Sequence, residues 1–378
     1  MQFQYLNRWL TQPPFFYSSP LYICPIMPIP EILISWYHEN KRDLPWRNTR
    51  DPYRIWLSEV ILQQTRVNQG LNYYLRFLER FPDVNALAVA EEEEVLKLWQ
   101  GLGYYSRARN LHEAARSIVK HHNGTFPGNY RDLLKLKGIG EYTAAAIASI
   151  AFGEPVAVVD GNVARVLSRL FAIEEAVNTV TGIKVLKQVA SELIPPGDPA
   201  TFNQAIMEFG ALLCKPKNPS CMICPIKDAC QAFQTGRVND LPVKEKKAPV
   251  RVVYLNYLVL LGKIKERDHV MLNKREKKGL WKNLYDFPSI ESYKEATEEE
   301  VIKQALEQGI LDGNPAERLS VSGIFHHQLT HRLIKARFFR ISLLECTKPR
   351  GSCKWVPYES LHSYPIPRLI ENYLGKVR

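Results

Sequence analysis

Apolar residues recur at every third or fourth position through most of the first 235 residues, the spacing of helices with one buried face. The segments with this spacing are 56–80, 84–99, 106–121, 142–152 and 162–171. Glycine and proline residues separate them. The exception is the short apolar stretch Pro155–Val159, which has strand character and leads to Asp160. We therefore expect an almost wholly helical domain over residues 27–235.

The pattern changes after a polar, basic and proline-marked segment at 236–249, which we interpret as a linker. Runs typical of strands follow at 250–261, 269–273 and 333–344, and one helix fits 296–309. Residues 250–378 should therefore form a second domain of the α+β class. The predicted fold class is a multidomain protein with an all-α part followed by an α+β part.

Residues 1–26 carry one charge, Arg8, and four prolines. They have neither the basic start nor the unbroken apolar core of a signal peptide. We interpret them as a leader that is disordered or not translated, with Met27 as the true start. No apolar run is long enough, and free enough of charge and proline, to predict a membrane span.

The chain has 378 residues and a formal net charge of +11, which indicates a polyanionic partner without naming it. The charge is unevenly divided. Residues 27–235 contain 23 basic and 22 acidic residues, whereas residues 236–378 contain 26 and 17. Contacts of the helical part with a polyanion must therefore depend on local clusters, such as residues 107–137 with seven basic and two acidic side chains.

Four of the seven cysteines lie within 17 residues, and their spacing predicts a metal centre. An odd cysteine number in a chain of this length indicates a reducing compartment rather than a disulfide framework. A structural zinc site is the main alternative, although zinc sites usually pair two short cysteine knuckles. The clustered residues are Cys214, Cys221, Cys224 and Cys230.

Three further features suggest functional residues, although each also has a purely structural explanation. Gly138 and Gly140 permit a tight turn before a helix whose free N–H groups could bind a phosphate, but a plain joint between helices has the same pattern. Asp160 is a good N-cap for a helix starting near Asn162. Glu59, among apolar neighbours, is either a solvated edge or a carboxyl group with a raised pKa.

These motifs together resemble a known family. The cysteine spacing resembles the 4Fe–4S loop of the endonuclease III-like DNA glycosylases, and the Gly138–Gly140 turn with Asp160 resembles their helix-hairpin-helix and its following aspartate. Leu44-Pro45-Trp46-Arg47, the segment 56–67 with Leu-Gln-Gln-Thr, and 101–107 closely resemble the MutY-type adenine DNA glycosylases.

The resemblance implies a role for each matching residue. Glu59 would protonate adenine at N7, and Asp160 would stabilise the oxocarbenium-like sugar. The adenine must leave the duplex to be reached. The four clustered cysteines would hold a 4Fe–4S cluster. The remaining DNA-binding assignments are Leu62, Gln64 and Tyr104 as wedges in the base stack; Arg42, Trp46, Arg47 and Glu208 around the adenine; and Gly138, Gly140 and Asn162 along the DNA.

Tyr142 distinguishes subclasses of this superfamily. Relatives that also cut the strand carry a lysine at this position, whose amine forms a Schiff base with the sugar, and a phenol cannot do so. Tyr142 therefore predicts a mainly monofunctional glycosylase, unless it is simply a packing residue.

The C-terminal part resembles the Nudix-like domain of the MutY type, most clearly at Gly279–Pro288. The paired glutamates of the Nudix hydrolase box are absent from the sequence, so no nucleotide pyrophosphatase activity is expected. Residues 327–331 resemble the loop that probes oxidised guanine, with Leu329 and Thr330 in place of Phe and Ser. Thr330 and His331 are the residues carried over.

The expected partner is double-stranded DNA with adenine opposite 8-oxoguanine, or opposite guanine, bound by a monomer without membrane contact. The expected location is the cytoplasm of a bacterium, or the nucleus or mitochondrion of a eukaryote. Two alternatives stay open: an endonuclease III-like pyrimidine glycosylase with lyase activity, and a non-catalytic iron–sulfur protein that only binds DNA.

Overall fold

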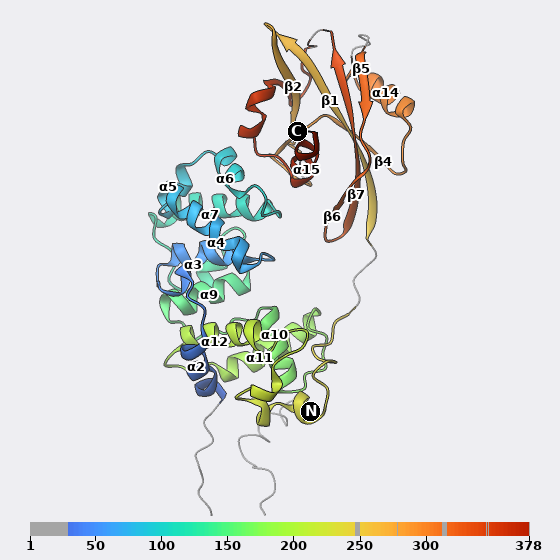
Figure 1. Cartoon of the computed structure of the whole chain (residues 1–378). Coiled ribbons are helices and arrows are strands. Elements are labelled where there is room, and N and C mark those ends of the chain that lie inside the picture. Colours follow the sequence, from blue (N-terminus) through green and yellow to red (C-terminus); the bar gives the residue numbers. More distant parts are fainter. Residues whose placement is uncertain are drawn as a thin grey trace, which may run out of the picture.

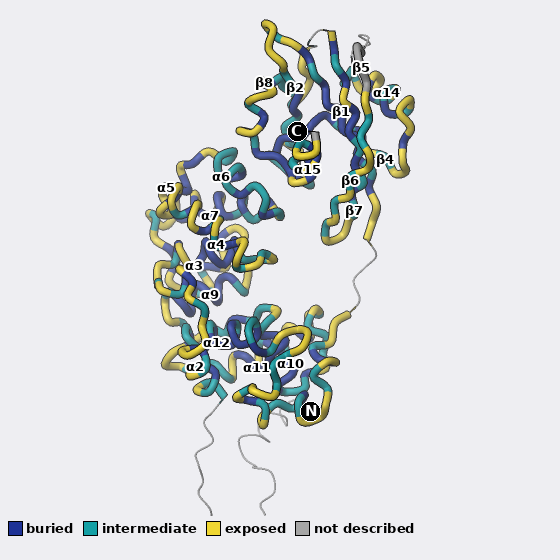
Figure 2. Tube along the Cα trace, in the orientation of Figure 1, coloured by how far each residue is buried: buried dark blue, intermediate teal, exposed yellow. Residues whose placement is uncertain are grey.

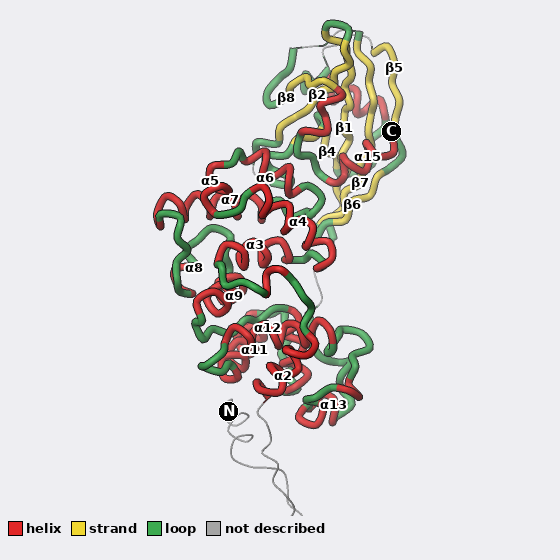
Figure 3. Tube along the Cα trace, turned by 60° about the vertical axis from the view of Figure 1, so that its left-hand side comes forward, coloured by secondary structure: helices red, strands yellow, loops and turns green. Residues whose placement is uncertain are grey.

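The computed structural model describes residues 29–245, 250–277, 279–311, 316–344, 346 and 348–377, so the leader 1–26 lies outside the described residues. Helices make up the first part of the chain and a sheet dominates the second (Figure 1; Figure 3). The predicted fold class is confirmed. Within the described residues, no helix is long and apolar enough to cross a membrane.

The helical part consists of two groups, each with its own buried interior (Figure 2). Helix α2 at the start of the chain packs on α12, so the second group joins segments far apart in sequence. The first group comprises α3 (Pro52–Leu62), α4 (Val67–Arg80), α5 (Val84–Val89), α6 (Glu92–Trp99), α7 (Ser106–His122), α8 (Tyr130–Leu133) and α9 (Glu141–Phe152). The second comprises α2 (Ile29–Asn40), α10 (Gly161–Leu170), α11 (Val180–Leu193), α12 (Pro199–Leu212) and α13 (Gln231–Gln234).

Three predictions for the helical part were wrong in detail. The segments 56–80 and 84–99 are each two helices, because turns at 63–66 and 90–91 interrupt them. Pro155–Val159 forms no strand. The side chain of Asn203 takes the place of a neighbouring strand, accepting from the Val158 N–H at 3.0 Å and donating to the Val156 carbonyl at 2.9 Å. Two polar groups of this extended backbone are therefore paired without a sheet.

The described residues of the second part form an eight-stranded mixed sheet. Its centre is a long parallel pair of strands, β1 and β7, in which Arg251 is opposite Arg332 and the register continues to Leu261 opposite Ser342. The strands are β1 (Arg251–Ile264), β2 (Arg267–Lys274), β3 (Tyr285–Asp286), β4 (Ser289–Ser292), β5 (Ala316–Val321), β6 (Phe325–Gln328), β7 (Arg332–Leu343) and β8 (Cys353–Pro357).

A helix covers each face of this sheet. Helix α14 (Glu298–Glu307) contributes Val301 and Ala305 to one apolar layer, beginning with a capping box at Thr297. The other face is covered by α15 (Arg368–Val377), where the Tyr373 ring stacks on Phe338 with centroids 3.9 Å apart. The sequence pattern revealed β1, β2, β7 and α14, but not the short strands or α15.

Candidate active site

A large open cleft lies between the two helical groups and is lined by side chains from both. Most of the residues that the sequence singled out meet there, although they come from five separate segments of the chain. Those lining the cleft are Arg42, Trp46, Arg47, Glu59, Leu62, Gln64, Gly138, Gly140, Tyr142, Asp160, Asn162 and Glu208. Tyr104, Thr330 and His331 lie outside it.

Glu59 is buried on the cleft side of α3, with 8% of its surface exposed. The burial raises its pKa to about 7, and the nearby Asp160 carboxyl acts in the same direction. The Tyr142 hydroxyl, which donates a hydrogen bond to Glu59, and the charge of Arg47 oppose this shift without cancelling it. The interpretation of Glu59 as a solvated edge is therefore wrong.

Asp160 is the N-cap of α10. One of its oxygens accepts from the Asn162 and Val163 backbone N–H groups at 2.9 and 2.7 Å. The other accepts from the Asn162 side chain at 2.7 Å. Burial raises the pKa of Asp160, while these three donors favour the ionised form. The Asp160 side chain can therefore cap α10 and present a negative charge to the cleft at the same time.

Glu208 is 1% exposed and receives two guanidinium groups. Arg42 and Arg47 each place a nitrogen 2.6 Å from its Oε2, and both also donate to Oε1. Burial alone would raise the pKa of Glu208, but Arg47 and Arg42 outweigh it and hold the pKa at about 2. One wall of the cleft is thus a rigid, ionised triad. Trp46 beside it is nearly buried, with its ring edge-on to Tyr74.

Arg107, which the sequence placed only within a matching motif, connects the two predicted wedge loops. Its guanidinium donates to the carbonyls of Val60 and Gln63, both at 2.7 Å, and to Gly103 at 3.2 Å. Gln64 and Tyr104 follow these carbonyls and both have positive φ, 56° and 46°. One half-buried cation therefore fixes the two turns that carry the predicted wedge residues.

The hairpin between α8 and α9 is a tight glycine turn followed by a helix start without a side-chain cap. Gly138 has a φ of 74°, and a Cβ there would lie 2.5 Å from the Cβ of Asn110, so only glycine fits. Gly140 is the N-cap of α9 and has no side chain that caps the helix. The start of α9 lines the cleft, and N–H groups at a helix start are a type of donor that binds phosphate.

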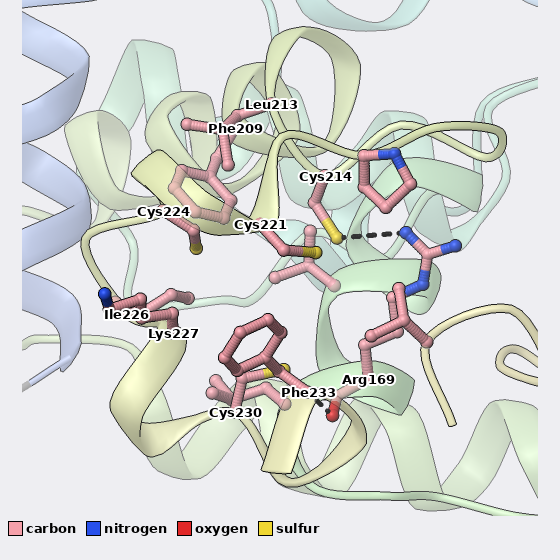
Figure 4. Close-up of a pocket in the computed structure, with 14 residues that line it drawn as sticks. Arg169, Phe209, Leu213, Cys214, Cys221, Cys224, Ile226, Lys227, Cys230 and Phe233 are labelled. Carbon is pink, nitrogen blue, oxygen red and sulfur yellow. Dashed lines mark hydrogen bonds between the residues drawn. The ribbon is translucent and has the colours of Figure 1, made fainter. Parts of the chain in front are cut away.

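The four clustered cysteines border one cavity, whose other walls are mainly apolar (Figure 4). Buried Arg169 donates to the Cys214 Sγ at 3.3 Å. In the described part of the chain, no three His, Cys, Asp or Glu side chains form a group that could hold a single metal ion. The four thiols line this cavity, and four thiolate donors with a nearby cation are the donor set that suits a thiolate-bound cluster.

Arg165 links this cysteine loop to the carboxylate side of the cleft. It donates to the Cys214 carbonyl at 2.7 Å and to the Asn162 side-chain oxygen at 2.9 Å. Asn162 in turn donates to Asp160. The sequence showed no signal for this arginine beyond its place one helical turn after Asn162.

The sheet domain touches the helical part close to the wedge loops. The Thr330 hydroxyl, in the β6–β7 turn, lies 2.9 Å from the Tyr104 hydroxyl. Polar contacts between α6 and the sheet domain include Lys274 with Glu93 at 2.6 Å. The β6–β7 turn is therefore held beside Tyr104, one of the predicted wedge residues.

Comparisons with known proteins agree with this geometry. Residues 57–195 match the family model described as "HhH-GPD superfamily base excision DNA repair protein", and residues 259–376 match that of the NUDIX domain. A solved thermostable thymine-DNA glycosylase is 30% identical, with a TM-score of 0.50, covering 55% of this chain and 95% of that one. Fold and site thus define a base-excision-repair DNA glycosylase with a Nudix-like second domain.

Two similar proteins show to which family of DNA glycosylases the chain belongs. The adenine DNA glycosylase of Buchnera aphidicola subsp. Schizaphis graminum is 32% identical over 355 residues, covering 91% of this chain and 97% of that protein. That of subsp. Baizongia pistaciae is 36% identical over 259 residues, 68% of this chain and 72% of that protein. The chain belongs to the adenine DNA glycosylases, which hydrolyse N-glycosyl bonds in DNA. The MutY-type resemblance is confirmed.

Proposed function

We propose that this enzyme removes adenine paired with 8-oxoguanine, and with guanine, by acid-assisted departure of a flipped-out base. The observation that carries the proposal is the pair of carboxyl groups in one cleft with different surroundings: Glu59, whose pKa burial raises to about 7, and Asp160, whose ionised form is favoured by three N–H donors. Two such groups divide acid and charge-stabilising roles. The test is single-turnover release of adenine from duplexes with adenine opposite 8-oxoguanine, guanine or thymine.

Glu59 acts as the acid in this mechanism. Adenine leaves poorly as an anion, so a proton delivered to N7 lowers the barrier to its departure. Tyr142 orients the Glu59 carboxyl through its hydroxyl. The ionised triad of Glu208, Arg42 and Arg47 then supplies a fixed polar wall for the flipped base, and Trp46 closes the pocket beside it.

Asp160 acts on the sugar. Departure of the base leaves positive charge at C1′, and an ionised carboxylate at the N-terminus of α10 stabilises it. Duplex DNA is held by the α9 N-terminus and Gly138–Gly140 turn on its phosphates, with Asn162 alongside, while Leu62, Gln64 and Tyr104 fill the stack. Thr330 and His331 contact the base opposite the adenine.

We further propose that Cys214, Cys221, Cys224 and Cys230 hold a 4Fe–4S cluster, with Arg169 near Cys214 offsetting its negative charge. When bound, the cluster ties the loop 214–230 into one rigid unit. Asp160 itself is positioned by Asn162 and, behind it, by Arg165.

A pH profile tests the acid role of Glu59. The protonated form is the active one, so activity is present below the raised pKa and lost above it. We expect the single-turnover rate to fall about tenfold per pH unit above about pH 7. Rates measured between pH 5.5 and 9 check this. A rate that is flat or that rises through pH 7 would exclude Glu59 as the acid.

The substitution Tyr142→Lys tests the monofunctional character. The Tyr142 hydroxyl lies at the Glu59 carboxyl, where a lysine amine would face the sugar carbon and form a Schiff base. We expect the wild type to leave an abasic site cut only after alkali, and the variant to cut the strand without it. Denaturing gels and borohydride trapping of the DNA–protein adduct measure both.

Lys187 supplies the control for this experiment. It also lines the cleft, but its amine is paired with Glu141 at the start of α9. Lys187→Met should leave strand cutting unchanged in both backgrounds. Efficient alkali-independent cutting by the wild type would overturn the proposal and favour the lyase alternative.

A further inference from the structure

The turn 279–284, which follows β2 and is named here the Trp281 turn, has an unusual backbone. Trp281 and Asn283 have φ values of 59° and 63°, in the left-handed region that non-glycine residues rarely adopt. Such conformations persist only where neighbouring groups hold them, and they concentrate at functional sites.

Arg275 holds the Trp281 turn from inside its own domain. Its Nε donates to the Leu280 carbonyl at 3.0 Å, and its backbone N–H donates to the Leu284 carbonyl at 3.0 Å. Its Nη1 lies 2.6 Å from a carboxylate oxygen of Asp286, which is completely buried. Asn273 donates to the other Asp286 oxygen at 3.0 Å. The shape of the turn is therefore fixed by an ion pair between half-buried Arg275 and a fully buried, hydrogen-bonded carboxylate.

The Trp281 turn is also attached to the helical part. Arg109 in α7 donates to the Lys282 carbonyl at 2.9 Å. The Asn283 side chain donates to Glu92 in α6. The turn is therefore a fixed point between the two parts of the chain, close to the loop that carries Tyr104.

On its other side the turn supports β6. The Trp281 ring is 7% exposed and packs against the His327 ring, with centroids 5.7 Å apart and planes tilted by 59°. His327 precedes the β6–β7 turn by two residues, and Thr330 in that turn meets Tyr104. These contacts form a closed ring that runs from Tyr104 through α7, the Trp281 turn and β6, and returns to Tyr104.

We infer that Trp281, with the Arg275–Asp286 pair behind it, positions the β6–β7 turn and thereby sets how strongly the enzyme distinguishes 8-oxoguanine from guanine opposite the adenine. This rests on the proposed contact of Thr330 and His331 with that base. Trp281 is a positioning residue, because it reaches β6 through His327. Small displacements of a contacting group are enough to lose most of its effect.

Single-turnover rates on two duplexes test the inference, one with adenine opposite 8-oxoguanine and one with adenine opposite guanine. Trp281→Leu keeps an apolar side chain but removes the ring, so the rate on the first duplex should fall about tenfold and the rate on the second should change less than about twofold. Trp281→Phe keeps a ring and should restore most of the difference. Tyr293→Leu, on an 88% exposed ring of the same domain, is the matched control.

Arg109→Met breaks the same ring of contacts from the helical side and leaves the core of the sheet domain unchanged. It is the decisive variant if Trp281→Leu does not fold. It should show the same selective loss. Equal losses on both duplexes, or none in either variant, would overturn the positioning role. If the double variant Thr330→Ala, His331→Ala loses discrimination between the two duplexes but Trp281→Leu and Arg109→Met keep it, the proposed contact with the opposite base stands and the positioning role of Trp281 is wrong. If the double variant keeps this discrimination, the proposed contact itself is wrong.

Discussion

Glu59→Gln is expected to lower the single-turnover rate of adenine release by about 10²–10⁴-fold, the usual contribution of a positioned general acid. Glutamine keeps the size of the side chain and can accept the Tyr142 hydrogen bond, but it carries no transferable proton. DNA binding should persist, because the proposed phosphate contacts lie elsewhere. Quenched-flow or manual single-turnover assays with gel-shift titrations separate the two effects.

The same substitution should also stabilise the fold at alkaline pH. The pKa of Glu59 is raised from 4.5 to about 7 by folding, so its contribution to stability is fully present below about pH 4.5 and is lost as the pH rises to about 7. Glutamine removes this loss, raising the free energy of unfolding at pH 8 by up to about 3 kcal/mol. Denaturant unfolding at pH 5 and pH 8 measures it. Glu113→Gln, on an exposed residue of α7, should change neither quantity.

An inactive Glu59→Gln variant that is also less stable at pH 8 would contradict this account. Its inactivity would then reflect damage to the fold. A variant that keeps most of its activity would instead require another acid in the cleft.

Asp160→Asn is expected to reduce the rate by about 10²–10³-fold, through loss of the charge that stabilises the sugar cation. Asparagine caps helices as well as aspartate does, so α10 should be preserved. Because burial raises the pKa of Asp160, removal of its charge should not lower the stability at neutral pH. The predicted signature is loss of activity without a lower unfolding midpoint, measured by single-turnover kinetics and thermal unfolding.

Asp83→Asn is the matched control for this substitution. Asp83 caps α5 by accepting from two backbone N–H groups, as Asp160 does for α10, but it lies outside the cleft. It should leave the rate unchanged. If Asp160→Asn is as active as Asp83→Asn, Asp160 is a cap and the assignment of its catalytic role fails.

The sequence by itself determined the order of elements and the classes of chemistry. Helical periodicity over residues 27–235 and strand composition from 250 onward are local properties, so most long elements were predictable. Strands β3, β4, β6 and β8 have two to five residues, too few for an alternating pattern to be visible. The motifs around Glu59, Asp160 and Cys214 were visible because their spacing within the chain is short.

Only the tertiary structure determined which contacts those groups make and how they ionise. Glu59 and Tyr142 are 83 positions apart, and Arg42 and Glu208 are 166 apart, so neither contact has a local sequence signal. The connecting role of Arg107 likewise depends on carbonyls more than 40 residues away. A pKa is set by burial and by neighbouring charges, and both arise when distant segments pack together. The sequence therefore showed the residue types, whereas the raised pKa of Glu59, the ionised Glu208 triad and the fixed turns at Gln64 and Tyr104 result from the fold.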